Sequence, residues 1–398
     1  MAVAKMAVLR PLGEMLLLGV MLASPLFLWA QSNEETAAPG SDPEEHSWWG
    51  EIGFNGYASF SYTYNTNDPV PPMNQFRVFD FNDNSPQVDA AQFVVQHQVS
   101  EEKPLGFRLN MIAGAGVPQV TASHGMEIAR DFDIPEAYLS YVAPFGKGLR
   151  VDAGKFATPF GYEVIGGYDG YNDNFSRGFI FGYGLPFTHT GMKSSYSFSS
   201  RISAAAFVTN GCDAVTRLNG GVTAIGQFSA VTSKTTSLAF TFLHGPEKPH
   251  NSHDETSIYE LVGTWKVLPR LSLAFDGLYA DEDHAASNGS DAIWKGLAGY
   301  SKYSLTKALS VAFRGEVFAD IGGSRTGTSQ TLRGFTMTPE YVLAAKASRL
   351  SRELRRFDGK LAVRGDFRQD LSDRNAFRQG MGFTDRQFTT AVNLIYLF

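Results

Sequence analysis

Apolar and polar residues alternate with a period of two along most of this chain. The pattern is clear from residue 51 to residue 64, where one parity is apolar and the other is polar. The apolar positions are Ile52, Phe54, Ala58, Phe60, Tyr62 and Tyr64. Such alternation predicts a β-strand with one apolar face. The strand is longer than the roughly 5–6 residues usual in soluble proteins and fits the roughly 9–11 residues of a tilted membrane-spanning strand.

The same alternation recurs in segments that extend to the end of the chain. Clear examples lie at 91–99, 105–111, 271–279, 309–317 and 357–368. Turn-forming clusters separate them, for instance at 144–148, 268–270 and 281–284. Repeated amphipathic strands divided by turns predict an all-β protein.

The N-terminal segment has the composition of a secretory signal. Lys5 and Arg10 precede an apolar stretch, and Ala30 supplies a small residue at a cleavage point before Gln31. An uncleaved helical anchor is the alternative, which the prolines and Glu14 disfavour. Residues 31–47 are acidic and nearly free of apolar side chains, so they predict a flexible leader. A β-rich domain then spans residues 48–398.

Two architectures can use these strands. A soluble sandwich or barrel would turn the apolar faces inward, whereas a transmembrane barrel turns them toward lipid and lines its lumen with the polar faces. Strand length, the secretory signal and the absence of a second apolar layer favour a closed antiparallel transmembrane β-barrel. About 368 residues follow the signal, and roughly 23 residues per strand and connection give about 16 strands, within a range of about 12 to 18.

The last strand supports this interpretation. Residues Phe388, Thr390, Val392, Leu394, Tyr396 and Phe398 share one parity, and the chain ends on Phe398. A final strand that ends in phenylalanine resembles the C-terminal signal that outer-membrane proteins present to the barrel-assembly machinery. Tyr396 and Phe398 are therefore candidates for an assembly signal, and an ordinary closing strand is the alternative.

Composition and charge exclude several classes of protein. The net charge of −6 argues against nucleic acid as a partner, because phosphate binding needs a basic surface. One cysteine excludes a disulfide scaffold and cysteine-based metal centres within one chain. No run of about 18 apolar residues follows the leader, so the mature chain has no candidate transmembrane helix. No phosphate-binding glycine loop opens a helix, and we expect neither cofactor nor metal.

Several motifs carry a resemblance to a known family. The stretch 151–163 (VDAGKFATPFGYE) is followed by 174–178 (NFSRG), 186–191 (PFTHTG) and 364–370 (RGDFRQD), before the terminal Phe398. On these motifs the chain resembles bacterial outer-membrane porins, most closely the OmpL-like putative β-barrel porin-2 family. The resemblance covers residues from about 48 to 398. It implies a channel or general diffusion role without naming a solute.

The segment 159–186 is long for a barrel connection and is rich in glycine and aromatic residues. Porins fold one long loop into the lumen, and this segment is our candidate for that loop. Its charged residues are Glu163, Asp169, Asp173 and Arg177. Glycines allow sharp turns against the wall, and the carboxylates would set the local field. The alternative is an external loop packed on the rim.

Charged residues on the polar parity of the strands are candidates for lining the pore. They are Arg108, Glu136, Arg150, Asp152, Arg314, Glu316, Arg364, Asp366 and Arg368. Charges cost little on a face that water covers, and opposed signs would create a transverse field. The alternative is that they form salt bridges that stiffen the wall.

Other candidate sites are weaker. Residues 80–84 (DFNDN) have alternating oxygen ligands but lack the glycine and the closing acid of a calcium loop, so we expect a turn. His189 near Ser194 and Ser195 could suggest a hydrolase, but no carboxylate partner is evident. Cys212 resembles a turn residue. Surface positions explain the remaining histidines more simply than metal binding; these are His244, His250, His253 and His284.

These observations predict an exported outer-membrane porin, not an enzyme, through which small hydrophilic solutes or ions diffuse passively. Its expected partners are outer-membrane lipid, the barrel-assembly machinery and the solutes. Porins commonly form trimers, so a homotrimer is compatible with the resemblance, although no residue indicates a subunit interface. The rivals are a non-conducting outer-membrane barrel that acts as an enzyme or adhesin, and a secreted soluble β-rich binding protein.

Overall fold

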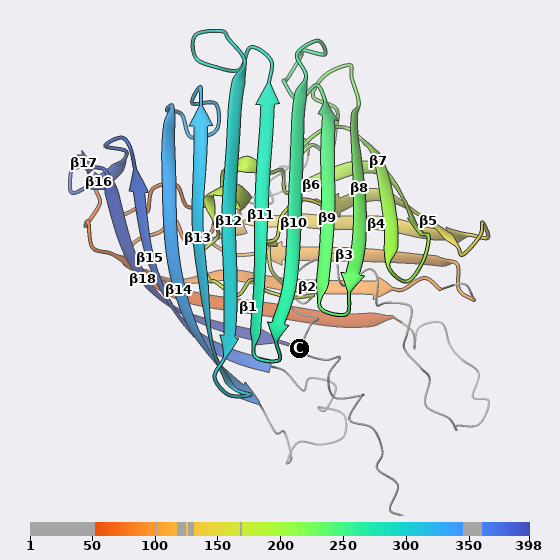
Figure 1. Cartoon of the computed structure of the whole chain (residues 1–398), viewed down its shortest axis with the longest axis horizontal. Helices are drawn as coiled ribbons and strands as arrows, with labels where there is room; N and C mark the ends of the chain where they lie inside the picture. Colours follow the sequence, from red (N-terminus) through yellow and green to blue (C-terminus); the bar gives the residue numbers. More distant parts are fainter. Residues whose placement is uncertain (1–51, 101, 118–124, 126–130, 168, 345–359) are drawn as a thin grey trace, which may run out of the picture.

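Sixteen antiparallel strands close into one barrel in the computed structural model, which describes residues 52–100, 102–117, 125, 131–167, 169–344 and 360–398. Each strand pairs with its neighbours in sequence, and the ring closes between β1 and β18 (Figure 1). The strands are β1 (Gly53–Asn65), β2 (Ser85–His97), β3 (Leu105–Ala113), β4 (Phe132–Ala143), β5 (Leu149–Ala157), β6 (Thr188–Ser197), β7 (Ile202–Thr209), β8 (Thr223–Ser233), β9 (Thr236–Gly245), β10 (Thr256–Leu268), β11 (Leu271–Glu282), β12 (Ala292–Ser304), β13 (Leu309–Ile321), β14 (Gln330–Ala344), β15 (Lys360–Ser372) and β18 (Arg386–Leu397).

The barrel has its apolar face outside, as the alternation predicted for a membrane protein. On β1, Phe60 and Tyr64 are 43% and 44% exposed, whereas Ser61 and Thr63 between them are buried. Lipid cannot hydrogen-bond free backbone groups, so a closed ring in which every strand is paired is the stable form of such a sheet. The prediction of about 16 strands in a closed antiparallel barrel is confirmed.

The closing seam joins the two ends of the described chain. Phe398 N donates to Gly56 O at 3.0 Å, and Gly56 N donates to Phe398 O at 2.7 Å. The Phe398 ring occupies the space above Gly56, where a Cβ atom would lie 2.1 Å from the ring. Tyr396 stacks on Phe398 with centroids 5.7 Å apart. The terminal aromatic residue therefore packs on the first strand of the barrel.

Long connections lie at one end of the barrel, and most connections that the structure fully describes at the other end are short turns. The long ones include 66–84, 158–187 and 210–222, whereas 198–201 and 234–235 are short turns. A small hairpin, β16 (Phe377–Gln379) with β17 (Gly382–Thr384), sits in the connection from β15 to β18. Among the described residues, no helix is long and apolar enough to span a membrane. The predicted signal 1–30, the leader 31–47, Trp48 and Trp49 lie outside the described residues.

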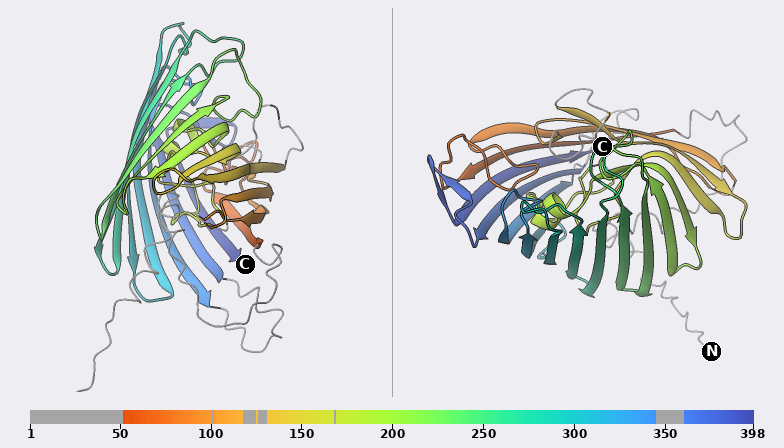
Figure 2. Two further views of the ribbon diagram at one scale, coloured as in Figure 1. Left: turned by 90° about the vertical axis from the view of Figure 1, so that its right-hand side faces the viewer. Right: turned by 90° about the horizontal axis from the view of Figure 1, so that it is seen from above.

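The connection from β5 to β6 lies inside the ring of strands, not on its rim. It includes a short π-helix, η3 (Ile180–Gly184), which is visible within the barrel when it is viewed from above (Figure 2). The barrel is flattened in this view, so its two broad walls face each other across the connection. This arrangement determines which parts of the inner wall are covered.

Candidate functional site in the barrel lumen

The lumen loop, residues 158–187, is held in shape by its own side chains. Arg177 donates from Nη1 to Phe175 O (2.6 Å) and from Nη2 to Ile165 O (2.5 Å), which ties the two arms of the loop together. Asn172 bonds Val164 twice, accepting from its N–H at 2.8 Å and donating to its carbonyl at 2.6 Å. A loop without regular structure must satisfy its backbone groups in this way when water is excluded.

Carboxylates on strands β10–β15 accept hydrogen bonds from the backbone of the loop. Gly161 N donates to Glu260 at 2.8 Å, and Phe179 N donates to Glu316 at 2.6 Å. Phe175 N donates to Asp366 at 3.0 Å. These side chains anchor the loop along the inner face of β10–β15, which we call the covered half of the lumen.

Arginines in the covered half complete these anchors. Arg314 forms an ion pair with Glu163 of the loop at 2.7 Å, and both side chains are almost fully buried. Arg364 donates to Asn172 O at 2.6 Å, and Arg368 donates to Arg177 O. Because buried charges are stable only when they are paired and hydrogen-bonded, the arginines and the loop depend on each other.

Apolar contacts also hold the lumen loop against the wall. Phe160, Phe179 and Ile180 of the loop belong to one buried cluster with Trp294 and Phe318 of the wall. Trp294 and Phe318 both point inward, and Phe318 shares its parity with the charged residues Arg314, Glu316 and Asp320 of β13. Inward apolar residues also occur on the opposite wall, at Phe156 and Phe207, so such residues do not by themselves locate the loop.

A second connection, residues 66–84 between β1 and β2, also folds inward, which was not predicted from the sequence. Its Arg77 is buried and donates to Asp370 at 2.8 Å and to Thr389 at 2.9 Å. Phe79 stacks on Phe181 of the lumen loop with centroids 6.3 Å apart, and the Arg177 guanidinium lies 4.3 Å from the Phe79 ring centroid. Apolar side chains inside a long connection were the available signal.

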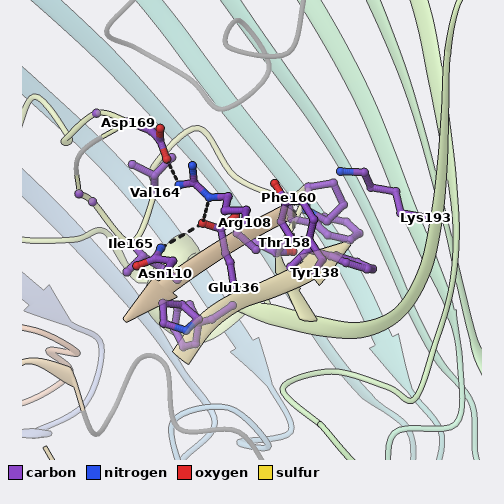
Figure 3. A pocket seen from close by; sticks show the side chains of 18 of the residues that line it. Arg108, Asn110, Glu136, Tyr138, Thr158, Phe160, Val164, Ile165, Asp169 and Lys193 are labelled. Atoms are coloured by element: carbon purple, nitrogen blue, oxygen red, sulfur yellow. Dashed lines mark hydrogen bonds and ion pairs between the residues drawn. The ribbon is translucent and has the colours of Figure 1, made fainter. Parts of the chain in front are cut away.

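The opposite wall is not covered. A cavity of about 390 Å³ lies between the lumen loop and the inner face of β2–β8, which we call the open half of the lumen. Arg108 crosses part of this space: its Nε contacts Glu136 at 2.7 Å, and its Nη2 reaches Asp169 at the tip of the loop (Figure 3). Asn110 adds a hydrogen bond to Glu136 at 3.0 Å.

A second charged group on the open half consists of two cations and one acid. Arg150 Nε lies 2.8 Å from Asp152 Oδ1, and Lys193 Nζ lies 2.8 Å from Asp152 Oδ2. Ser140 donates to Asp152 at 2.6 Å. Asp152 is fully buried behind the two cations, so the positive groups face the cavity.

The structure divides the nine charges that were predicted to line the pore. Arg108, Glu136 and Arg150 line the cavity, and Asp152 lies behind Arg150. The other five are buried beneath the lumen loop and bind it or one another; these are Arg314, Glu316, Arg364, Asp366 and Arg368. Their environment matches the salt-bridge alternative better than exposure to a pore.

The four charged residues predicted on the loop also have different positions. Asp169 is 39% exposed at the tip and faces Arg108. Asp173 lines the cavity and pairs with Lys302 of β12 at 2.7 Å. Glu163 and Arg177 are buried and hold the loop in place.

The weaker candidates show no arrangement for chemistry. His189 is buried, with Nε2 3.2 Å from Thr158 Oγ1 and Nδ1 3.3 Å from Gly211 O, so no serine is activated. Asp80 pairs with Arg77, and Asp83 accepts the Asn65 N–H at 2.6 Å, so the two acids of residues 80–84 serve internal contacts of the connection. In the described parts of the chain, no group of three histidine, cysteine or acidic residues could hold a metal ion.

One titratable group outside the strands helps to fix the end of the lumen loop. Asp213, in the connection 210–222, accepts the N–H groups of Phe187 (3.0 Å) and Thr188 (2.8 Å). Burial raises the pKa of this carboxyl to about 6, although the hydrogen bonds oppose the shift. Next to it, burial also raises the pKa of the Cys212 thiol, which keeps the thiol protonated at neutral pH.

Comparison with protein-family models gives a match over residues 51–398. The matching family is described as putative beta-barrel porin-2, OmpL-like. The chain belongs to this family. The resemblance that the sequence motifs carried is thereby confirmed, and the chain is an outer-membrane β-barrel of the porin class. A comparison with curated protein sequences finds no match.

Solved structures of outer-membrane channels share the fold. The anion-selective porin from Comamonas acidovorans has a TM-score of 0.57 at 10% identity, covering 87% of this chain and 99% of that chain. The outer-membrane channel DcaP of Acinetobacter baumannii has a TM-score of 0.53 at 9% identity, covering 87% and 97%. The in-vitro folded OmpT of Vibrio cholerae, in its trimer form, has a TM-score of 0.52 at 10% identity, covering 87% and 99%. At these identities the likeness concerns the fold alone.

Proposed function

We propose that this protein lets small hydrophilic solutes or ions diffuse passively across the outer membrane through the open half of the lumen. The observation that carries the proposal is the one-sided position of the lumen loop. The loop is anchored to β10–β15 and leaves a cavity of about 390 Å³ against β2–β8. Asp169 and Asp173 from the loop and Arg108, Arg150 and Lys193 from the wall all line this cavity, so a solute would pass charges of both signs.

The proposal includes the route to the membrane. Residues 1–30 act as a cleaved export signal, residues 31–47 remain as a leader, and Tyr396 and Phe398 present the assembly signal to the barrel-assembly machinery. The contact between Phe398 and Gly56 at the closing seam supports a role for the terminal residue in barrel closure. N-terminal sequencing of protein from outer membranes tests the cleavage point, and we expect it to begin at Gln31.

A homotrimer is part of the same proposal. OmpT of Vibrio cholerae, which shares the fold, is described in a trimer form. Strands β5 and β7 have 9 and 8 residues, whereas β10 and β12 have 13 each. The wall with the shorter strands, in the open half of the barrel, would therefore face a neighbouring subunit. Light scattering of the detergent complex measures the protein mass, and a monomer would contradict this part.

The direct test of the pore is conductance of the refolded mature chain in a planar bilayer. We expect discrete current steps that scale with salt concentration, and a reversal potential in a salt gradient that reports the wall charges. A folded barrel that produces no steps would contradict the proposal. That result would instead favour a non-conducting barrel that serves as an enzyme or adhesin.

A further inference from the structure

The open half of the lumen contains an imbalance of charge at one place. Arg150 of β5 and Lys193 of β6 share a single acid, Asp152, and neither cation lies within ion-pair distance of another acid in the described residues. The two cations are 23% and 18% exposed, whereas Asp152 is fully buried. The exposed surface of this group is therefore cationic, and its direct ion pairs leave one positive charge over, although Glu136, which pairs with Arg108, also acts on Lys193 through space.

The Arg150 guanidinium has a hydrogen-bond donor that no described residue accepts from. Its Nε bonds Asp152 at 2.8 Å and its Nη2 bonds the Ser140 hydroxyl at 3.2 Å, but its Nη1 makes no hydrogen bond to the described residues. The Lys193 ammonium has three donors and one ion-pair partner. Both side chains line the cavity, so these donors are available to a solute that carries an anionic group.

Aromatic rings lie directly beside these donors. Lys193 Nζ is 5.9 Å from the Tyr138 ring centroid and 5.7 Å from the Phe156 centroid. Phe156 in turn packs on Phe207 with centroids 5.5 Å apart, and all three rings line the cavity. Tyr138 is only partly buried, so its ring surface is accessible from the lumen. Figure 3 shows Lys193 and Tyr138 on the side of the cavity away from Asp169.

We propose that this corner of the lumen, formed by Tyr138, Arg150, Phe156 and Lys193, is a binding subsite for small aromatic carboxylates. The carboxylate accepts hydrogen bonds from Lys193 Nζ and Arg150 Nη1, because bonds to charged groups are the strong ones in a partly dry site. The aromatic ring of the solute lies against the Tyr138 ring, which is the accessible one, since Phe156 is only 2% exposed. The cavity of about 390 Å³ is large enough for a single-ring solute.

The proposal predicts an order of preference among simple solutes. Benzoate satisfies both the cations and the rings and binds best. Acetate meets only the cations, so it binds more weakly. Benzylamine offers the ring but carries a positive charge that Lys193 and Arg150 repel, so it binds least.

Saturation-transfer NMR on the full mature chain, folded in detergent, tests this subsite with benzoate as the probe. The variants are Lys193→Gln and Tyr138→Ala, with Lys234→Gln in the 234–235 turn as the matched control. Removing one charge-assisted bond weakens binding about tenfold, so we expect that loss for Lys193→Gln and no change for Lys234→Gln. In Lys193→Gln, Asp152 keeps Arg150 and Ser140 as partners, which preserves the fold.

Tyr138→Ala separates the ring contact from the charge. We expect this variant to bind acetate as the wild type does and to lose most of the preference for benzoate over acetate. Benzoate that does not bind in a saturable way, equal binding by Lys193→Gln and Lys234→Gln, or equal binding of benzoate and acetate by the wild type would each overturn the subsite.

The subsite rests on the proposed pore, since a solute reaches it through the lumen, but the two can fail separately. Binding is measured in detergent and needs no current. Current steps without benzoate binding would overturn the subsite and leave the pore intact. Benzoate binding that depends on Lys193 in a barrel without current steps would support the subsite and overturn the proposed passive diffusion.

Discussion

The two halves of the lumen wall both carry inward-facing charged residues, but these residues have different environments. Arg314 on β13 and Arg108 on β3 both stand on the polar parity of a strand, and each has an acid nearby. Arg314 is fully buried beneath the lumen loop, whereas Arg108 borders the cavity. The difference lies in what faces each residue across the lumen. An inward charge becomes a loop anchor or a pore-facing group according to the path of the loop.

The covered half shows why a porin wall needs charges that no solute meets. The lumen loop has little regular structure, so its backbone N–H and C=O groups require partners from the wall. Glu260, Glu316 and Asp366 accept from its N–H groups, and Arg364 and Arg368 donate to its carbonyls. These residues replace the water that would otherwise solvate the loop.

Removing the lumen loop should give the largest effect. Replacing residues 160–185 with a short glycine–serine linker would merge the two halves, and the conductance of each channel should rise severalfold because the aqueous cross-section increases. Shortening the external connection 246–255 serves as the control and should leave the conductance close to that of the wild type. An unchanged conductance after deletion of the loop would show that the loop does not narrow the path.

The same substitution in each half should have different effects on stability. Arg314→Met leaves Glu163 buried without its cation and leaves Glu316 with only its longer contact to Arg368, and removing one partner of a buried pair costs about 3–5 kcal/mol. Arg108→Met acts on a pair that borders the cavity, with Arg108 9% and Glu136 15% exposed, so its cost should be smaller than that of Arg314→Met. Urea unfolding of barrels in lipid vesicles compares the two free energies of unfolding. Equal losses would remove the distinction between the halves.

Ion selectivity should also respond differently to the loss of a charge in each half of the lumen. Lys193→Gln and Arg364→Gln each remove one positive charge, the first beside the cavity and the second beneath the loop. The reversal potential in a salt gradient should move toward cation preference in Lys193→Gln, with a much smaller shift in Arg364→Gln, because permeating ions respond to the charges that line their path. A larger shift from Arg364→Gln would place the path in the covered half.

The smallest effect should come from Asp213, which fastens the end of the lumen loop. Burial raises the pKa of the Asp213 carboxyl to about 6, whereas its pKa in the unfolded chain is about 4. Between these two pH values the native chain holds a proton on Asp213 that the unfolded chain has released. The stability that this group contributes is fully present below a pH of about 4 and is lost as the pH rises through about 6. Asp213→Asn should therefore gain on the order of 1–2 kcal/mol relative to wild type between pH 4 and pH 7. A difference in stability that does not vary with pH would contradict this assignment.

The barrel could be predicted because its signal is local. A period of two is visible within each strand, and it placed Phe60 and Tyr64 on one apolar face. Strand length, the export signal and the absence of a second apolar layer then favoured turning that face toward lipid. The length of the segment 159–186 similarly marked it as an unusual connection. These features depend only on neighbouring residues in the chain.

The distribution of charges over the two halves could not be predicted, because it depends on contacts between distant residues. Arg314 and Glu163 are separated by 151 positions, and nothing near either residue distinguishes their pair from that of Arg108 and Glu136. Phe318, an apolar residue on the polar parity of β13, does not mark the covered half either, because Phe156 and Phe207 also point inward in the open half. The inward fold of 66–84 depends on the same kind of distant contact, through Arg77 and Asp370.

Cysteine accessibility tests the central claim, that solutes pass along the open half, most directly. In a Cys212→Ser background, Ser229→Cys places a thiol on the cavity wall at a partly exposed position, and Thr338→Cys places one beneath the loop, where the wild-type residue is fully buried. A charged methanethiosulfonate reagent is then added to single channels in a bilayer. We expect Ser229→Cys to react and lose conductance in discrete steps, while Thr338→Cys remains unmodified. Rapid block of Thr338→Cys with no effect on Ser229→Cys would contradict the account.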